Sequence, residues 1–304
     1  MPEFLHPNAE VFVRKSSVTI LSGGNALDHL DRCLTASLVD LENFDRRDAL
    51  LCDANGRIQD RITICVLDNQ IIALGSEKSG TSTREILLRG IGWDEDVSLL
   101  DGDNAISHLS IIGQNIHRPL VGLGVDCSEL SSSRWLEFGN SLISSSMTNS
   151  VEIVDVALPK SELQGFLDIL QDNGCYEIPT DKWDAMRMLI GITEIADIIG
   201  NLPFEVGLNE LVKLDKGCYP GQEIHARLDS RGKLARRLMR LVSANEFELG
   251  QHKVEGIGTL YVTSTSSNND ANVAYALVPS AACELDELTI SSDQVIGLEP
   301  LIQN

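Results

Sequence analysis

The last third of this 304-residue chain differs in pattern from the rest, and this change limits the fold more than any other feature of the sequence. Five short apolar segments follow one another there, separated by Gly, Asn, Asp and Ser, at residues 238–242, 253–255, 257–265, 273–278 and 288–290. Short strands at close spacing are typical of a small all-β barrel. We therefore expect residues 236–304 to form a C-terminal β-barrel, with a polar loop at residues 264–270.

The preceding region, residues 1–235, mixes helical and strand patterns. An Asn55-Gly56 pair separates the apolar segment 49–52 from Ile58–Leu67, and such a pair supplies the positive φ angles of a tight hairpin. Further strands are predicted at residues 18–21, 70–74, 97–100, 106–112, 136–144 and 151–158, and helices at 26–34, 83–88, 161–172 and 181–189. The serine-rich runs 128–133 and 141–150 are predicted to be surface loops. The fold class is therefore α+β.

The charge of the chain argues against a nucleic-acid partner. The sequence has 24 Lys and Arg against 45 Asp and Glu, so its net charge is −21. A surface this acidic repels phosphate backbones, and an aromatic content of 5% leaves few side chains for base stacking. The apolar runs end well short of the roughly 20 residues that a membrane span needs. We expect neither direct nucleic-acid binding nor a membrane partner.

The cysteines indicate a reducing compartment. There are seven, an odd number, and no two form a Cys-x-x-Cys pair. This spacing does not fit a zinc knuckle or a self-contained iron–sulfur site. No basic stretch followed by an apolar run opens the sequence, so we expect a cytoplasmic protein whose cysteines are mostly small buried residues.

One stretch, residues 216–227, concentrates chemically useful residues, and we call it the signature segment. Two nearby glycines, Gly217 and Gly221, flank Cys218, and Pro220 restricts Tyr219 to an extended conformation. A tight loop is therefore expected to present Cys218 ahead of a helix that starts near Gly221. The helix N-terminus and the ammonium of Lys216 both favour a thiolate, which makes Cys218 a candidate reactive thiol or metal ligand. The alternative is a buried cysteine in a structural turn. His225, within the same helix, is expected on its surface.

Basic residues continue beyond this segment. Six of the 24 Lys and Arg lie within residues 227–240. They are Arg227, Arg231, Lys233, Arg236, Arg237 and Arg240. Such a concentration in an acidic chain suggests a polyanion site for a glutamyl tail, a phosphate or RNA. The alternative is a solvated face whose charges are paired with carboxylates.

A second candidate comes from strand alternation. In Ile58–Leu67 the residues at even positions share one face, and Asp60 is the one carboxylate among four apolar neighbours. A buried carboxylate needs partners or must become neutral, so Asp60 is a candidate functional residue. The alternative is that it lies at the strand start, partly solvated, and pairs with Arg57 or Arg61.

The signature segment also resembles that of the YgfZ-type folate-binding proteins. The matching positions are Lys216, Gly217, Cys218, Tyr219, Gly221, Gln222, Glu223, Ala226 and Arg227. Segments 186–191, 202–208 and 256–264 resemble the same family. The resemblance implies the superfamily of the glycine-cleavage T-protein, an aminomethyltransferase, with a three-lobed α+β fold around a central folate channel. It also implies a role in assembly, insertion or repair of 4Fe-4S clusters in client enzymes, tRNA-modifying ones included.

The resemblance further implies which residues act. Asp60, Arg187 and Asp155 would contact tetrahydrofolate, and Cys218, with Lys216, would supply the reactive thiol. Tyr219, Gly221, Gln222, Glu223, Arg227 and Arg231 would form the signature and anion-binding surface. A 4Fe-4S cluster uses about four thiolates, so Cys218 would be a shared, transient ligand together with a client enzyme or cluster carrier.

The T-protein segment Gly-Tyr-Thr-Gly-Glu is not recognisable in this sequence. This departure puts aminomethyl transfer in doubt and leaves folate binding as the expectation. Enzymatic activity is therefore left open. A folate-dependent aminomethyltransferase or one-carbon transferase stays as one alternative, and a tRNA-interacting protein as another.

Overall fold

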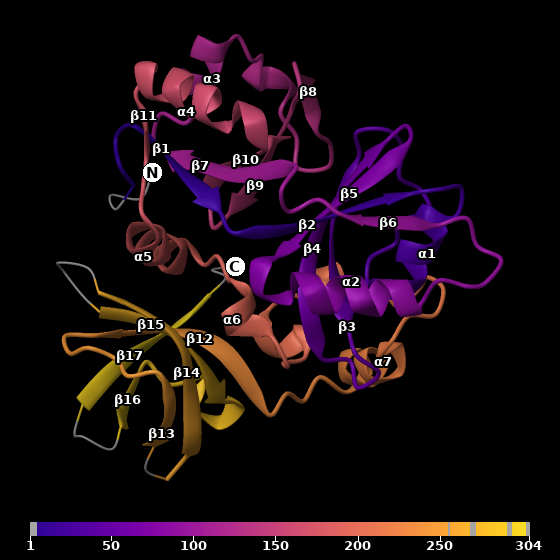
Figure 1. The fold of residues 1–304 in the computed structure, drawn as a ribbon. Helices are drawn as coiled ribbons and strands as arrows, with labels where there is room; N and C mark the ends of the chain where they lie inside the picture. Colours follow the sequence, from indigo (N-terminus) through magenta and orange to yellow (C-terminus); the bar gives the residue numbers. More distant parts are fainter. Residues whose placement is uncertain (1–4, 255, 268–271, 291–293, 302–304) are drawn as a thin grey trace.

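A computed structural model describes residues 5–254, 256–267, 272–290 and 294–301. Three sheets form three lobes, and the chain runs through two of them before it reaches the third (Figure 1). No helix among the described residues is long and apolar enough to cross a membrane.

The first lobe is an antiparallel sheet of strand order β3-β4-β5-β2-β6. Its strands are β2 (Ser16–Ser22), β3 (Arg46–Cys52), β4 (Ile58–Leu67), β5 (Gln70–Ser76) and β6 (Ser98–Asp101). Helices α1 (Ala26–Cys33) and α2 (Gly80–Arg89) belong to this lobe, and the apolar core contains Leu30 of α1, Leu87 of α2, and Ile62 and Ile64 of β4. The expected hairpin at Asn55-Gly56 joins β3 to β4, and Gly56 has a φ of +73°.

The second lobe is a six-stranded sheet of order β11-β1-β7-β10-β9-β8. Its strands are β1 (Ala9–Arg14), β7 (Ile106–Gly113), β8 (Leu136–Phe138), β9 (Ser141–Thr148), β10 (Val151–Pro159) and β11 (Cys175–Glu177). Helices α3 (His117–Leu123) and α4 (Leu163–Asp172) pack on it, with Leu120 and Leu170 in the shared core (Figure 1).

The third lobe is a closed barrel of order β12-β15-β14-β13-β16-β17. Its strands are β12 (Arg236–Ser243), β13 (Gly250–Val254), β14 (Gly258–Ser267), β15 (Asn272–Pro279), β16 (Glu287–Ile290) and β17 (Gln294–Pro300). Helices α5 (Thr180–Ile190), α6 (Ile195–Ile198) and α7 (Gln222–Arg231) lie between the second lobe and the barrel in the sequence. Six short 3-10 turns complete the described elements: η1 (Glu77–Ser79), η2 (Cys127–Glu129), η3 (Lys160–Glu162), η4 (Pro203–Val206), η5 (Asn209–Leu211) and η6 (Ser280–Ala282).

The predicted α+β class and the C-terminal barrel are confirmed. Strand β17, helix α3 and the division of 136–144 into β8 and β9 were not predicted, and part of the predicted loop 264–270 belongs to β14. Residues 268–270 lie outside the described residues.

The prediction of a surface loop at 141–150 was wrong, because residues 141–148 form strand β9. Leu142 and Ile143 are buried, and the Ser144 hydroxyl donates to the carbonyl of Ser131 at 2.7 Å while it accepts from Arg46 at 3.0 Å. Serines can occupy a buried strand when their hydroxyls are paired in this way.

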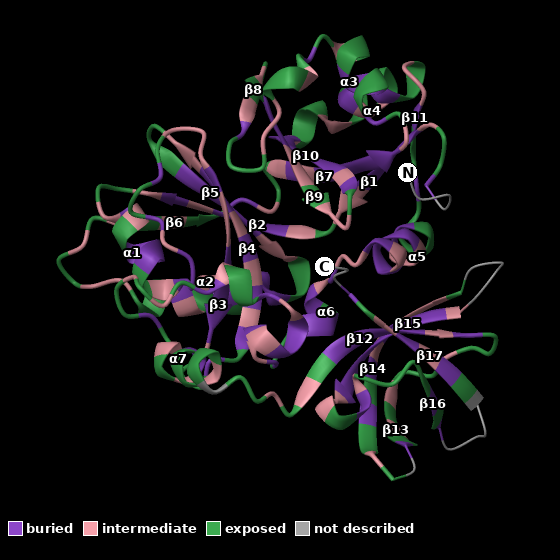
Figure 2. Ribbon diagram, turned by 180° about the vertical axis from the view of Figure 1, so that it is seen from behind, coloured by how far each residue is buried: buried purple, intermediate pink, exposed green. Residues whose placement is uncertain are grey.

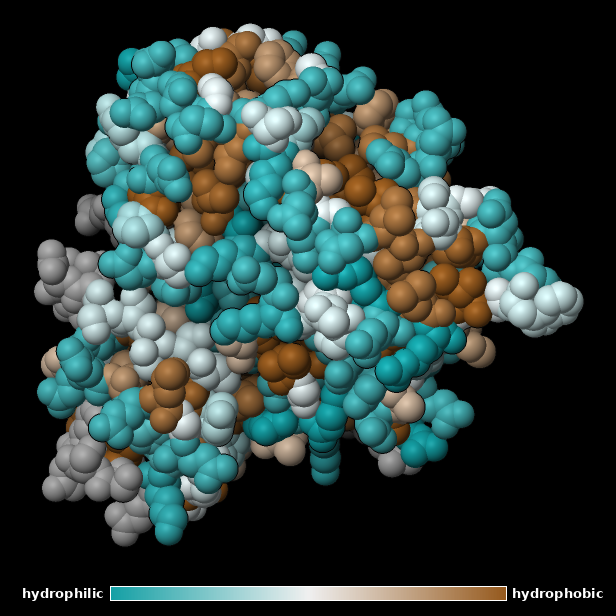
Figure 3. All heavy atoms as spheres, viewed as in Figure 1, coloured by the Kyte–Doolittle hydropathy of each residue, from teal (hydrophilic) through white to brown (hydrophobic). Residues whose placement is uncertain are grey.

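Burial follows the layers of the fold. Strands are buried along their inner faces, whereas α7 is largely exposed (Figure 2). The outer surface is mainly hydrophilic, as the net charge of −21 requires, but an apolar area interrupts it on the side of β6 (Figure 3). Leu100 of β6 is one of the exposed large apolar residues.

Candidate functional site

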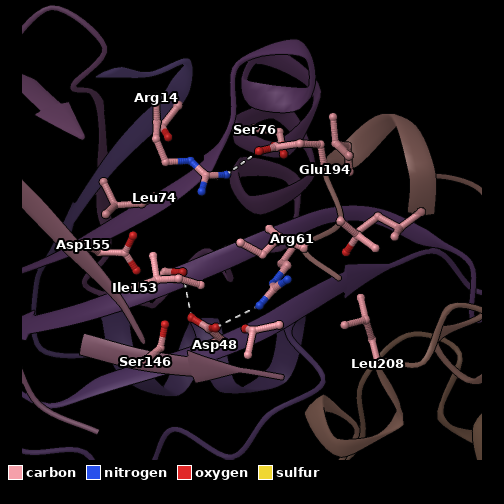
Figure 4. A pocket seen from close by; sticks show the side chains of 18 of the residues that line it. Arg14, Asp48, Arg61, Leu74, Ser76, Ser146, Ile153, Asp155, Glu194 and Leu208 are labelled. Carbon is pink, nitrogen blue, oxygen red and sulfur yellow. Dashed lines mark hydrogen bonds and ion pairs between the residues drawn. The ribbon is translucent and has the colours of Figure 1, made fainter. Parts of the chain in front are cut away.

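A cavity of about 280 Å³ lies where the first two lobes meet. Its wall includes residues from β2, β3, β4 and β5 of the first sheet and from β7, β9 and β10 of the second, together with residues of η4 and η5 and Leu301 near the chain end. The charged and titratable lining side chains are Arg14, Lys15, Arg46, Asp48, Arg61, His108, Asp155, Glu194 and Glu210. Figure 4 labels five of them: Arg14, Asp48, Arg61, Asp155 and Glu194. A polar cavity inside a protein core is costly unless its groups serve a ligand or one another.

The chain path explains why charged groups gather here. Strand β1 of the second sheet ends at Arg14 and strand β2 of the first sheet begins at Ser16, so Lys15 alone makes the crossing. All three residues line the cavity. Next to it, Val18, Leu74 and Trp135 belong to an apolar cluster that includes residues of both sheets.

Arg46 and Asp155 form the buried centre of one wall. The guanidinium donates to Asp155 at 2.8 Å and to Ser144 at 3.0 Å, and it lies 5.1 Å from the ring of Trp135. Burial is the largest influence and would raise the pKa of Asp155, but the Arg46 charge, together with His108 and Arg14, holds this pKa far below its usual range. Asp155 therefore stays a carboxylate at neutral pH.

Two further ion pairs line the cavity. Arg61 donates to Asp48 at 3.2 Å, and Asp48 also accepts from the Thr63 hydroxyl at 2.7 Å (Figure 4). Arg14 donates to Glu194 at 2.7 Å. Burial would raise the pKa of Asp48 and of Glu194, but Arg46 and Arg61 in the first case and Arg14 in the second lower both. Each carboxylate is thus ionised and has oxygen lone pairs left for a ligand.

A second cavity of about 370 Å³ adjoins the first. The two share Arg14, Lys15, Ser76, Glu194 and Ile195 as lining residues, so the Arg14–Glu194 pair stands between them. Phe12, Lys78, Trp183 and Arg187 also line the second cavity, which combines aromatic with basic side chains.

Arg187 is therefore near a ligand-sized space, but its guanidinium is already engaged. It donates to Asp184 at 2.6 Å, to Asp197 at 2.8 Å and to the carbonyl of Ile192 at 3.3 Å, and it is 3% exposed. Asp197 in turn accepts from the Thr263 and Ser264 hydroxyls of the barrel. These contacts give Arg187 a structural role that ties α5 and α6 to the barrel.

Asp60 is fully buried, as its alternation predicted, but it is not among the lining residues of these two cavities. It accepts hydrogen bonds from the Thr83 hydroxyl of α2 at 2.8 Å and from the amides of Arg61 at 2.9 Å and Ser76 at 3.2 Å. Burial raises its pKa, and these hydrogen bonds only partly oppose the rise. The cavity wall instead contains its neighbour Arg61, from the opposite face of β4. The geometry therefore argues against Asp60 as a direct ligand contact.

The signature segment lies outside the lining of both cavities, and most of its residues hold the segment in place. The Lys216 ammonium lies 3.0 Å from the carbonyl oxygen of Leu34, 2.6 Å from that of Ala36 and 3.1 Å from the Asp31 carboxylate, and it also contacts the Asp31 carbonyl. These oxygens use its three N–H donors. Burial lowers the Lys216 pKa, although Asp31 opposes this. Lys216 thus caps the end of α1, which differs from its expected role beside Cys218.

A buried histidine fixes the helix of the segment to the β3–β4 hairpin. His225 Nε2 lies 2.8 Å from the carbonyl oxygen of Gly56, and Nδ1 lies 3.2 Å from the Tyr219 hydroxyl. Gly221 has a φ of +85°, and a Cβ there would lie 2.3 Å from the Cα of Gly56. The expectation that His225 is on the helix surface was wrong, because the helix packs directly on the hairpin backbone and His225 is fully buried.

The Gln222 amide also holds the segment in place, because it donates to the carbonyls of Leu214 at 3.2 Å and Lys216 at 3.3 Å.

Cys218 is exposed, so the alternative of a buried structural cysteine does not hold. Glu223 and Arg227 are also exposed, with side chains 88% and 65% accessible and 3.8 Å apart. The described residues contain no group of three or more His, Cys, Asp or Glu that could hold a metal ion.

The basic run 227–240 does not form one surface. Arg236 donates to Glu205 at 3.2 Å and to Asn201 at 2.9 Å, and Arg240 binds Glu299 and the carbonyl of Leu189. These two cations join the barrel to neighbouring elements. Arg227, Lys233 and Arg237 stay exposed, which leaves a weaker anion surface than the sequence suggests.

Comparison with solved structures identifies a similar known fold. The chain is similar to the crystal structure of the glycine cleavage system aminomethyltransferase T from Bartonella henselae, with a TM-score of 0.84 and 16% identity, covering 99% of this chain and 86% of that one. This is a T-protein fold. The heterotetrameric sarcosine oxidase from Corynebacterium sp. U-96 matches 57% of this chain and 89% of its own, but its TM-score of 0.35 and identity of 14% are too low for any argument. No family model and no curated protein matches the sequence.

Sequence reasoning missed most of the cavity. Of its charged lining, only Asp155 was predicted to contact a ligand, and Arg14, Arg46, Asp48 and Glu194 were not named. One signal was present: Arg61 of β4 and Arg46 and Asp48 of β3 share the strand face opposite the apolar Ala49 and Ile62. Asp155, the partner of Arg46, comes from a second sheet distant in sequence, so this pair could not be read from the chain.

Proposed function

We propose that the chain binds a reduced folate in the two adjoining cavities and supports assembly, insertion or repair of 4Fe-4S clusters in client enzymes. The folate part rests on one observation above all: a T-protein fold has a ligand-sized cavity lined by ionised carboxylates and guanidinium groups. The cluster part rests on the exposed Cys218 within a segment that resembles the YgfZ-type signature.

The residues present fit a folate. Small-ligand sites usually have volumes of about 300–1,000 Å³, and the 280 Å³ and 370 Å³ cavities together fall within this range. Asp155 and Asp48 are carboxylates that can accept the paired N–H groups of a pterin edge. Lys15 and Lys78 can bind the carboxylates of a glutamyl tail, beside the aromatic Trp183.

Folate binding is tested by calorimetric titration with tetrahydrofolate. We expect Asp155→Asn to weaken binding at least tenfold, and the matched control Asp60→Asn to bind like wild type, because Asp60 belongs to the opposite face of the sheet. Should Asp155→Asn fail to fold around the unpaired Arg46, Ser146→Phe fills the cavity without removing a charge and is expected to abolish binding. Full binding by Ser146→Phe, or loss in Asp60→Asn alone, contradicts the proposed cavity.

The cluster role gives Cys218 one task, which is to contribute a single thiolate to a cluster whose other ligands come from the client or carrier. The client's cluster is then the substrate, and the exposed loop leaves the sulfur open to a second protein. The test is complementation in cells that lack the native protein, with activity of a 4Fe-4S client enzyme as the readout. Cys218→Ser is expected to fail and Cys127→Ser to succeed. Full rescue by Cys218→Ser would remove the cysteine from the proposal.

A folate-dependent aminomethyltransferase remains the second candidate, and the TM-score of 0.84 to an aminomethyltransferase is the observation that favours it. Purified protein, tetrahydrofolate and an aminomethyl-loaded lipoyl carrier would then yield methylene-tetrahydrofolate. Turnover would support the transferase, whereas binding without turnover would support the folate-binding factor.

A further inference from the structure

Three cavity residues from three different strands lie in a series that joins Asp155, which the folate proposal also uses, to two residues that it does not use. Ser16 of β2 has its hydroxyl oxygen 2.8 Å from Nδ1 of His108 on β7, and the other ring nitrogen, Nε2, lies 3.6 Å from the carboxylate of Asp155 on β10. All three residues line the first cavity. The order is hydroxyl, imidazole, carboxylate, which is the order of groups in serine nucleophiles.

The tautomer of His108 follows from its surroundings. Nε2 is buried and has no hydrogen-bond partner among the described residues, and the Asp155 carboxylate lies 3.6 Å from it. A proton on Nε2 is therefore favoured, which leaves Nδ1 as an acceptor for the Ser16 O–H. Burial lowers the pKa of His108, with Asp155 opposing and Arg14 and Arg46 adding to the shift, so the ring is neutral at neutral pH. The distance of 3.6 Å is long, as such contacts often are before a substrate is bound.

A cation, Arg14, contacts the same group of cavity residues. Arg14 lies two residues before Ser16 in the sequence, also lines the cavity, and donates to the Ser110 hydroxyl at 3.3 Å. Ser110 donates in turn to Asp155 at 2.8 Å, so Arg14 and Ser16 belong to one network. A guanidinium in a partly enclosed site can stabilise negative charge that develops on a nearby oxygen.

We propose that Ser16 is a nucleophile for acyl transfer, activated by His108, with Asp155 orienting the imidazole and Arg14 stabilising the oxyanion. The substrate class is a small ester or thioester. Ser16 Oγ forms a bond to the carbonyl carbon while its proton passes to His108 Nδ1. The bond to the leaving group then breaks, and that group takes the proton from His108. Water releases the acyl group by the same steps, so ester and water become acid and alcohol.

This activity shares the cavity and Asp155 with the folate proposal, but its test needs no folate and changes Ser16 and His108, to which no folate contact is assigned. The full chain is treated with a fluorophosphonate probe, in which the serine oxygen would displace fluoride from phosphorus, and the labelled residue is mapped by mass spectrometry. We expect labelling at Ser16, lost in Ser16→Ala and reduced at least tenfold in His108→Gln, since general-base catalysis contributes about 10²–10⁴-fold. Ser17→Ala, the neighbour on the other face of β2, is the matched control and is expected to label like wild type.

Hydrolysis of p-nitrophenyl acetate gives a second readout, with the same order of variants and a rate that falls as His108 is protonated below its lowered pKa. Thermal unfolding of each variant separates loss of the site from loss of the fold. Labelling that is no faster than in urea-denatured protein, that maps elsewhere, or that survives in Ser16→Ala would overturn the proposal.

Discussion

The signature segment and the cavity differ in how their residues are distributed along the sequence. The residues of the signature segment are close together in sequence and so form a recognisable motif. Lys216, Gly221 and His225 fix this motif against α1 and the β3–β4 hairpin, and Tyr219 and Gln222 hold it internally. In the cavity, the charged residues are scattered along the chain: Asp48 and Arg61 pair across one hairpin, whereas Arg46 pairs with Asp155 of another sheet. A recognisable motif can therefore be mostly scaffold around one exposed Cys218, while the polar pocket carries no motif at all.

The largest expected effect tests the scaffold role of Lys216. Replacing it in Lys216→Met removes the cation from Asp31 and from three carbonyls, and breaking such a buried pair costs about 3 kcal/mol. The free energy of unfolding, measured in urea, should fall by about this amount, and that of the exposed control Lys213→Met should not. An unchanged free energy of unfolding in Lys216→Met would contradict the structural role of Lys216 and would favour a role beside Cys218 instead.

Gly221→Ala should have the next largest effect. A Cβ at φ +85° is strained and would meet the backbone of Gly56 at 2.3 Å, so we expect a loss of about 2 kcal/mol. Gly217→Ala is the control within the same segment, because nothing lies within 4 Å of the added Cβ, and its change should stay below about 0.5 kcal/mol. Equal losses at both glycines would mean that the helix is not locked on the hairpin as described.

Low pH should weaken the contact of His225 with the β3–β4 hairpin and so lower the stability of the protein. Burial lowers the pKa of His225, although its hydrogen bond to Gly56 opposes this, so the unfolded chain binds a proton first as the pH falls below about 6.5. Stability should therefore fall between pH 7.5 and pH 5.5, and His225→Gln should lose less over this interval. The buried His29 and His108, whose pKa values are also lowered, keep part of the dependence in the variant. An identical pH dependence in wild type and variant would contradict this reading of His225.

The smallest effect is expected on the exposed face of the segment. Arg227→Ala removes a solvent-exposed pair with Glu223 at 3.8 Å and should change the free energy of unfolding by less than about 0.5 kcal/mol. If the exposed face serves a partner, the same variant should instead reduce rescue of a 4Fe-4S client enzyme in cells. A large loss of stability would show that Arg227 belongs to the scaffold.

Local patterns predicted much of the fold. The Asn55-Gly56 hairpin, the alternation of β4, the helical spacing of α4 and the short strands of the barrel each depend on residues close in sequence, so the chain alone was enough to find them. It was not enough for β9, where serines are buried because Arg46 of another lobe pairs with one of them. Nor did it reveal α3 or β17.

For the site, the sequence by itself determined that Asp60 shares a strand face with apolar residues, that glycines flank Cys218 and that one segment concentrates polar groups. Only the tertiary structure decided that Asp60 turns toward α2, that His225 is buried, and that Arg14, Lys15 and Ser16 meet His108 and Asp155 at a junction of two sheets. The physical reason is the distance along the sequence over which each effect acts. The alternation of apolar and polar residues in a strand, and the preferences of turn residues, depend on a few neighbouring residues. An ion pair forms between any two opposite charges that the packing of distant strands brings within about 4 Å.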